Sequence, residues 1–191
     1  MGNIYLVGFM ATGKTTVGKE LAKKKKWQFA DLDELIELKE RRTISQIFAQ
    51  EGEPYFRRVE KRVLQEVAKE DGFVVACGGG IVLDADNIKV MKKTGKMICL
   101  CACPEVILKR AEGFSHRPLL NVANPREKIE FLLKMRAPYY AQADYTVDTS
   151  SLSVAEAVDK IMALLFPKKR KAATGGSKRA RPKKIRRRVK G

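Results

Sequence analysis

A glycine-rich loop near the start of the chain constrains the fold more than any other feature of the sequence. Residues 8–15 read GFMATGKT and match the pattern G-x-x-x-x-G-K-[ST]. The loop follows an apolar segment of strand length at 3–7 and leads into a segment of helical character at 14–26. Its glycines let the backbone fold around phosphate oxygens, while backbone N–H groups and the positive end of the helix solvate the negative charge. The sequence therefore predicts a strand–loop–helix unit that binds phosphate groups.

Apolar segments of strand length alternate with longer segments of helical period along most of the chain. This alternation is typical of a parallel sheet that helices cover on both faces. We expect strands at 3–7, 27–31, 73–77, 96–102 and 144–148, and helices at 14–26, 33–42, 53–70, 84–94, 104–112, 125–142 and 153–165. The sequence therefore predicts one three-layer α/β domain over residues 1–167, with a five-stranded parallel sheet flanked by helices.

The residue types of the loop favour a nucleoside triphosphate as its ligand. Lys14 can reach the β- and γ-phosphates, and the hydroxyl of Thr15 can ligate Mg²⁺. The expected ATP contacts within the loop are Gly8, Ala11, Thr12, Gly13, Lys14, Thr15 and Thr16. A GTPase would need a base-reading motif such as N-K-x-D, which the sequence lacks. A small-molecule kinase is therefore favoured over a GTPase switch.

Two carboxylates end the second predicted strand, in the sequence Asp31-Leu32-Asp33. Ligands of open α/β sheets bind at the carboxyl edge of the strands, where these residues lie. One aspartate can face the metal, and the other can orient an acceptor alcohol and accept its proton. The alternative is structural, with Asp33 serving only as the cap of the next helix.

The third predicted strand ends in Cys77-Gly78-Gly79-Gly80, where the absence of side chains permits close approach and leaves backbone N–H groups for an anion. The alternative is a flexible turn. Arg57 lies on a long predicted helix and Arg136 on another, and two converging arginines would make a fork-shaped carboxylate site. The sequence alone does not show that they converge.

Charge is distributed unevenly along the 191 residues. The net charge is +17, from 39 Lys and Arg against 22 Asp and Glu, but residues 168–191 carry 13 of the basic residues and no acidic one. The body is therefore only about +4. The last predicted helix begins at a capping box, Ser153 to Glu156, and ends before Pro167.

The tail 168–191 is low in complexity and predicted to be disordered when free. It could bind nucleic acid or another polyanion non-specifically. The alternatives are an anionic membrane surface, an acidic protein or an extension of artificial origin. The tail has no aromatic residue, so base stacking is not expected.

The sequence favours a cytoplasmic protein. No apolar run approaches the ~18 residues that span a bilayer, and the N-terminus lacks the basic region of a signal peptide. The four cysteines are interpreted as small buried thiols in a reducing compartment rather than as metal ligands. Residues 112–124 have no period and contain Gly113 and Pro118, which is typical of a mobile connection between helices.

Taken together, these motifs resemble the shikimate kinase family. The resemblance covers about residues 3–165, and its six motifs occur in the order and spacing of that family. They are GFMATGKT at 8–15, DLD at 31–33, FRRVE at 56–60, GGG at 78–80, RPLL at 117–120 and RAPYY at 136–140. The resemblance implies a nucleoside monophosphate kinase-like P-loop fold and an ATP:shikimate 3-phosphotransferase of aromatic amino-acid biosynthesis, acting with Mg²⁺ as a monomer.

The resemblance also implies roles for the acceptor side. Asp33 would hold the acceptor hydroxyls and act in catalysis. The substrate carboxylate and neighbouring oxygens would be bound by Arg57, Arg136 and the backbone of the glycine segment: Gly78, Gly79 and Gly80. Glu60 would orient Arg57.

On the nucleotide side, the resemblance implies that Lys14 is catalytic and that Asp31 acts near Mg²⁺ through water. Arg117 would be a catalytic lid arginine that closes over the ATP phosphates from the segment 112–124, and Arg110 would lie beside the adenine. Ala11 departs from the family, which commonly has glycine at this position.

Two other functions stay open from the sequence. One is a related P-loop kinase for another polyhydroxy acid such as gluconate, against which Arg57, Gly79 and Arg136 argue together. The other is a kinase-fold scaffold that binds nucleic acid through the basic tail. Residues competent for catalysis occupy the motif positions, which favours the enzyme.

Overall fold

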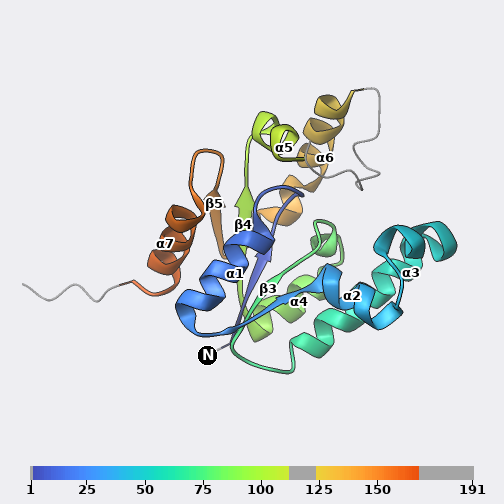
Figure 1. Cartoon of the computed structure of the whole chain (residues 1–191), viewed down its shortest axis with the longest axis horizontal. Helices are drawn as coiled ribbons and strands as arrows, with labels where there is room; N and C mark the ends of the chain where they lie inside the picture. Colours follow the sequence, from blue (N-terminus) through green and yellow to red (C-terminus); the bar gives the residue numbers. More distant parts are fainter. Residues whose placement is uncertain (1, 112–123, 168–191) are drawn as a thin grey trace, which may run out of the picture.

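The computed structural model describes residues 2–111 and 124–167 (Figure 1). The predicted lid and the basic tail lie outside these residues, apart from Asn124 at the lid's end. The strands are β1 (Asn3–Val7), β2 (Gln28–Asp31), β3 (Phe73–Ala76), β4 (Gly95–Cys101) and β5 (Tyr145–Asp148). The helices are α1 (Lys14–Lys25), α2 (Leu32–Glu40), α3 (Ile44–Val67), the 3₁₀ turn η1 (Ile81–Leu83), α4 (Ala85–Thr94), α5 (Pro104–Ala111), α6 (Pro125–Tyr140) and α7 (Val154–Leu165).

All five strands form one parallel sheet in the order β2-β3-β1-β4-β5. The predicted five-stranded α/β fold is therefore confirmed. Because the strands are parallel, their carboxyl ends meet at one edge, and β3 lies between β1 and β2. The segments that follow these three strands are consequently neighbours in space.

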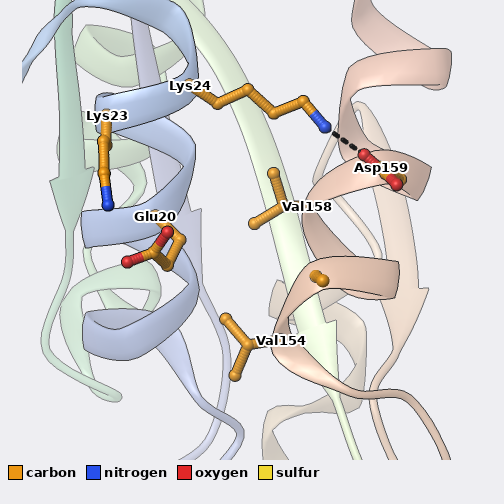
Figure 2. A pocket seen from close by; sticks show the side chains of 7 residues that line it. Glu20, Lys23, Lys24, Val154, Val158 and Asp159 are labelled. Carbon is orange, nitrogen blue, oxygen red and sulfur yellow. Dashed lines mark hydrogen bonds and ion pairs between the residues drawn. The ribbon is translucent and has the colours of Figure 1, made fainter.

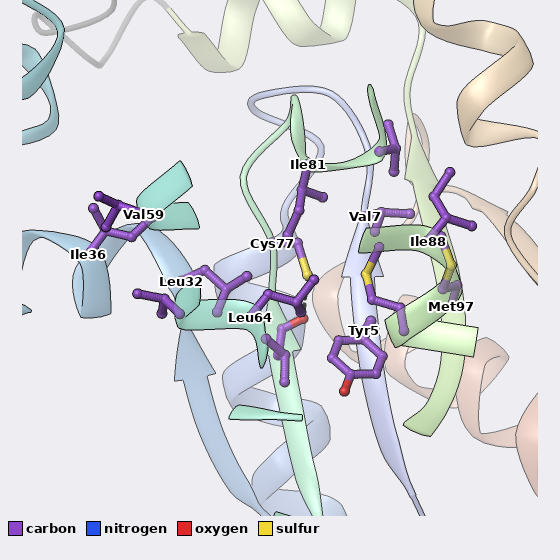
Figure 3. Close-up of a cluster of buried hydrophobic side chains, with 14 of the residues drawn as sticks. Tyr5, Val7, Leu32, Ile36, Val59, Leu64, Cys77, Ile81, Ile88 and Met97 are labelled. Atoms are coloured by element: carbon purple, nitrogen blue, oxygen red, sulfur yellow. Dashed lines mark hydrogen bonds between the residues drawn. The ribbon is translucent and has the colours of Figure 1, made fainter. Parts of the chain in front are cut away.

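The side chains of β1 alternate between two hydrophobic layers. Ile4 and Leu6 pack against the face covered by α1 and α7, while Tyr5 and Val7 pack against the face covered by α2, α3 and α4. Figure 3 shows Tyr5 and Val7 among the side chains of this second layer. Both faces of the sheet are buried, as expected for a parallel sheet between helices.

A third, smaller apolar cluster lies beyond the carboxyl end of the sheet. It joins Phe9 of the glycine-rich loop to Ile107 of α5 and Ile129 of α6. In Figure 1, α5 and α6 lie at this end of the molecule, above the tip of β4. The glycine-rich loop therefore packs against α5 and α6, two helices that come much later in the chain.

The helix expected at 53–70 differs from the observed helix at both ends. Helical structure instead spans Ile44–Val67 and is broken at Gly52, whose φ of 78° and ψ of 174° are not helical. Thr43 begins it with a capping box to Gln46, a start signal that the sequence prediction overlooked. Pro54 follows the break, near the start of the second helical piece, where proline is tolerated.

None of the helices in the described part of the chain is long and apolar enough to cross a membrane.

Two leucine-to-alanine changes test the packing of the helices on the sheet. Leu21 of α1 is 0% exposed, whereas Leu38 of α2 is 76% exposed. We expect Leu21→Ala to lower the free energy of unfolding by about 2–5 kcal/mol, because it removes buried methyl groups and leaves a cavity. Leu38→Ala should change it by less than about 0.5 kcal/mol. Urea unfolding measures both, and equal losses would contradict the assigned packing.

Candidate functional site

The predicted site residues gather at the carboxyl edge of the sheet. The glycine-rich loop follows β1, the Asp31–Asp33 segment joins β2 to α2, and the glycine segment 78–80 follows β3. Because β3 lies between β1 and β2, the glycine segment lies between the phosphate loop and the two aspartates. The structure thus brings together groups that are far apart in the sequence.

The glycine-rich loop has the backbone that its sequence predicts. Gly8 and Gly13 have φ values of 135° and 92°, in the region that favours glycine. A Cβ at Gly8 would also lie 2.1 Å from the carbonyl oxygen of Leu100. The Nζ of Lys14 donates to the carbonyl oxygens of Gly8 (3.0 Å) and Phe9 (2.7 Å), which holds the ammonium group against the loop.

Two further features of the loop concern its charge and its strain. The N-cap residue of α1 is Gly13, which has no side chain to accept a hydrogen bond from the first N–H groups of the helix. Such a helix end favours anions. Ala11 adopts φ 59°, a left-handed conformation that costs a non-glycine residue about 1 kcal/mol or more. Alanine at position 11, where the resembling family commonly has glycine, therefore strains the backbone.

Thr15 and Asp31 form the part of the site suited to a metal ion. The Thr15 hydroxyl donates to Asp31 Oδ2 at 2.8 Å, and Asp31 Oδ1 accepts the backbone N–H of Asp33 at 3.0 Å. Asp31, not Asp33, is therefore the cap of α2, and the capping role considered for Asp33 is wrong. A hydroxyl and a carboxylate are hard oxygen donors, the type that Mg²⁺ prefers, so these residues fit that ion.

Asp33 and Glu60 approach the same glycine. A Cβ added to Gly78 would lie 2.8 Å from Oε1 of Glu60 and 3.0 Å from Oδ1 of Asp33. Both carboxylates therefore lie against the backbone of Gly78, and a side chain at this position would displace them. Asp33 is half-buried, which leaves part of its surface toward solvent at the carboxyl edge.

Arg57 is held by two acidic residues of its own helix. Its NH1 group donates to Glu60 Oε2 at 2.7 Å, and its Nε and NH2 groups donate to Glu53 Oε1 at 3.1 and 2.9 Å. The guanidinium lies on Gly80, where a Cβ would come within 2.4 Å of NH2. The second arginine, Arg136, donates from NH1 to the carbonyl oxygen of Gly79 at 3.3 Å. The two arginines thus reach consecutive glycines from α3 and α6.

Glu60 is the most deeply buried charged group near the site. Its side chain is 1% exposed, and its Oε1 atom has no hydrogen-bond partner among the described residues. Burial raises the pKa of Glu60, an effect that the guanidinium of Arg57 opposes without cancelling. Glu60 therefore fixes the position of Arg57 at an energetic cost to the folded state.

Hydrogen bonds of Arg110 and Thr149 link the glycine-rich loop to the segment that follows β5. Arg110 NH2 donates to the Thr149 carbonyl at 2.8 Å, and NH1 donates to the Thr149 hydroxyl at 3.2 Å. The same hydroxyl lies 3.1 Å from the Thr12 carbonyl. Arg110 is thus placed beside the glycine-rich loop. Sequence reasoning missed Thr149, because a single threonine after a strand carries no motif.

Tyr140 is the second residue near the site to which sequence reasoning gave no role. It belongs to the RAPYY motif that supported the family resemblance, so the motif contained the signal. Its hydroxyl donates to the carbonyl oxygen of Gly79 at 2.6 Å.

The remaining predicted residues are placed as follows. Thr12 is buried and donates its hydroxyl to the carbonyl of Phe9 at 2.8 Å, so it shapes the loop, whereas Thr16 is exposed. Arg117 lies outside the described residues. A separate groove of about 500 Å³ lies between α1 and α7, where Lys24 pairs with Asp159 (Figure 2). No predicted site residue lines it.

A glutamine at position 60 tests the electrostatics. The raised pKa of Glu60 means that its contribution favours folding below the ordinary glutamate pKa and is lost as pH rises through the folded-state pKa. Glutamine does not titrate, so Glu60→Gln should gain unfolding free energy relative to the unchanged protein as pH rises above the ordinary glutamate pKa of about 4.3. Urea unfolding at a series of pH values measures this difference.

The matched control for that experiment is Glu53→Gln, which changes the exposed partner of Arg57. Its stability relative to the unchanged protein should not improve with pH in the same way. A Glu60→Gln variant whose relative stability stays constant, or falls as pH rises, would contradict the assigned burial cost.

Comparison with known proteins agrees with this geometry. The family model described as shikimate kinase matches residues 10–166. The shikimate kinase of Thermoanaerobacter pseudethanolicus is 48% identical over 162 residues, which cover 85% of this chain and 95% of that protein. The shikimate kinase of Thermodesulfovibrio yellowstonii is 44% identical over 162 residues, 85% of this chain and 94% of that protein.

Solved structures give the same result. A shikimate kinase from Acinetobacter baumannii, in complex with shikimate, superposes with a TM-score of 0.83 at 41% identity, covering 86% of this chain and 93% of that one. A gluconokinase from Sinorhizobium meliloti is 15% identical with a TM-score of 0.52, covering 85% of this chain and 90% of that one, and shows the shared fold alone. On the family match and these identities, the chain belongs to the shikimate kinase family.

Proposed function

We propose that this chain transfers the γ-phosphoryl group of ATP to the 3-hydroxyl of shikimate, giving ADP and shikimate 3-phosphate. The observation that carries the proposal is the meeting of two kinds of binding group at one edge of the sheet. Along the segment 78–80, Asp33 lies against Gly78, the phosphate-binding loop and Arg136 lie against Gly79, and Arg57 lies against Gly80. Family membership supports the same acceptor.

The acceptor half suits a molecule that carries one carboxylate and several hydroxyls. Arg57 and Arg136 bring two guanidinium groups to consecutive glycines, and guanidinium forks bind carboxylates in bidentate geometry. Asp33 supplies a carboxylate oxygen that can accept hydrogen bonds from alcohol groups. Glu60 holds Arg57 in place from within the core.

The donor half suits the phosphates of ATP. Lys14 and the N-terminus of α1, which begins after Gly13, provide positive charge where the loop closes around the phosphates. Arg110, which the resemblance places beside the adenine, is held next to the loop by Thr149. The lid role of Arg117 stays a prediction. Phosphoryl transfer depends mainly on positioning and charge neutralisation, which these groups supply.

Mg²⁺ is the metal that this site fits: Thr15 would hold it, and Asp31, which accepts a hydrogen bond from the Thr15 hydroxyl, would act beside it through water. When bound, the ion supplies positive charge that neutralises the phosphate oxygens. Asp33 orients the acceptor hydroxyl and accepts its proton as the new bond to phosphorus forms. The chain's own residues therefore bind both substrates and move the proton.

Three further expectations stay predictions of the sequence. They are the division into a domain at 1–167 and a tail at 168–191, polyanion binding by that tail, and a monomeric state in the cytoplasm. The proposed phosphoryl transfer requires none of them.

A panel of acceptors tests the proposed function. Release of ADP from Mg²⁺-ATP is measured with shikimate, quinate, gluconate and nucleoside monophosphates. We expect turnover with shikimate to exceed that with each other acceptor, because the site pairs a carboxylate fork with a hydroxyl-binding aspartate. A folded sample that binds ATP but shows no shikimate-dependent turnover would contradict the proposal.

Replacing Asp33 tests its assigned role. Asp33→Asn keeps the shape of the side chain but removes the proton acceptor, so kcat should fall by about 100-fold or more. Glu34→Gln is the matched control, because Glu34 directly follows Asp33 in α2, is exposed and has no assigned role. Steady-state kinetics of both variants, with circular dichroism to show that each is folded, gives the result. An unchanged kcat in Asp33→Asn would remove the role.

A further inference from the structure

The carbonyl oxygen of Gly79 accepts hydrogen bonds from two side chains of α6. The hydroxyl of Tyr140 donates to it at 2.6 Å, and NH1 of Arg136 donates to it at 3.3 Å. The tyrosine bond is short and the arginine bond is long for their types. The same guanidinium is the one that the proposed function assigns to the carboxylate of the acceptor.

The tyrosine is buried, whereas the arginine is only half-buried. Tyr140 is 8% exposed and belongs to the hydrophobic layer that also contains Tyr5 and Val7. Burial raises the pKa of Tyr140 to about 12, so its hydroxyl stays protonated and remains a donor at neutral pH. Arg136 is half-buried, with a long side chain whose charged end lies toward the site.

A carbonyl oxygen in a partly buried position needs at least one donor, since leaving it unpaired costs free energy. Without the Tyr140 hydroxyl, Arg136 would be the remaining side-chain donor to Gly79 among the described residues. The NH1 group would then be drawn closer to the carbonyl, and the carbonyl and the acceptor would compete for the position of the guanidinium.

We propose that Tyr140 is a positioning residue for the acceptor: its hydroxyl satisfies the Gly79 carbonyl and so leaves Arg136 available to bind the acceptor's carboxylate. This inference rests on the proposed function, because it concerns the same acceptor half of the site. It assigns a separate task to each of two neighbouring donors. Tyr140 itself does not touch the substrate.

The variant Tyr140→Phe tests the inference, because it removes the hydroxyl and keeps the buried ring. We expect the KM for shikimate to rise about tenfold, while the KM for ATP stays within about twofold, since the loop that binds ATP does not use this bond. The matched control is Tyr139→Phe, at the neighbouring residue, whose side chain is 38% exposed. It should leave both KM values unchanged. Thermal unfolding of both variants establishes that each is folded.

A second measurement separates competition for Arg136 from a general loss of structure. The same kinetics are run with the methyl ester of shikimate, which lacks the carboxylate. Tyr140→Phe should lower kcat/KM about tenfold for shikimate but less than about twofold for the ester, because the ester does not depend on the guanidinium. Equal losses for both compounds, or a rise in the KM for ATP as large as that for shikimate, would overturn the inference.

The unchanged protein measured in parallel keeps the two proposals apart. If it does not turn over shikimate, the proposed function fails. If it does, and Tyr140→Phe keeps the KM for shikimate of the unchanged protein, the function stands and the role of Tyr140 is refuted.

Discussion

The absence of side chains at residues 78–80 is the constraint on which the rest of the site depends. Gly78 and Gly80 let side chains come closer than a Cβ would allow, whereas a Cβ at Gly79 would make ordinary contacts. Asp33 and Glu60 lie against the first, Arg136 and the phosphate loop against the second, and the guanidinium of Arg57 against the third. None of the three has a positive φ, so Gly78 and Gly80 serve close approach rather than an unusual backbone conformation. Larger residues at 78 and 80 would displace Asp33, Glu60 and the guanidinium of Arg57.

The parallel sheet explains why these groups meet. The strand order places β3 between β1 and β2, so the three segments that leave their carboxyl ends lie side by side. Helices α3 and α6 then bring one arginine each to the middle segment. Burying Glu60 to hold Arg57 works against folding at neutral pH, and the hydrophobic layers on both faces of the sheet offset that cost.

Local patterns predicted the elements well where each pattern was complete. The strands follow apolar runs, and the capping box at Ser153 marks the start of α7 as expected. The equivalent box at Thr43 was overlooked, so the helical piece before Gly52 was missed. Asp33 was considered as a helix cap, whereas the preceding Asp31 takes that role, because a shift of two residues within one motif is not visible in the pattern.

Contacts between distant residues could not be predicted in this way. The bond from Tyr140 to Gly79 joins residues 61 positions apart, and the bonds from Arg110 to Thr149 join residues 39 positions apart. Sequence spacing does not encode such pairs, since they depend on how the helices dock on the sheet. The family resemblance named the arginines of the site but gave no role to Tyr140 or Thr149, whose hydroxyls hold its backbone and side chains in place.

A crystal structure of the protein with shikimate tests the central claim most directly, because the claim concerns where the acceptor lies. We expect the carboxylate of shikimate within hydrogen-bonding distance of the guanidinium groups of Arg57 and Arg136, and ring hydroxyls on the carboxylate of Asp33. Tyr140 should still donate to Gly79 in that complex. Shikimate bound away from the segment 78–80, or with its carboxylate turned away from both arginines, would contradict the account.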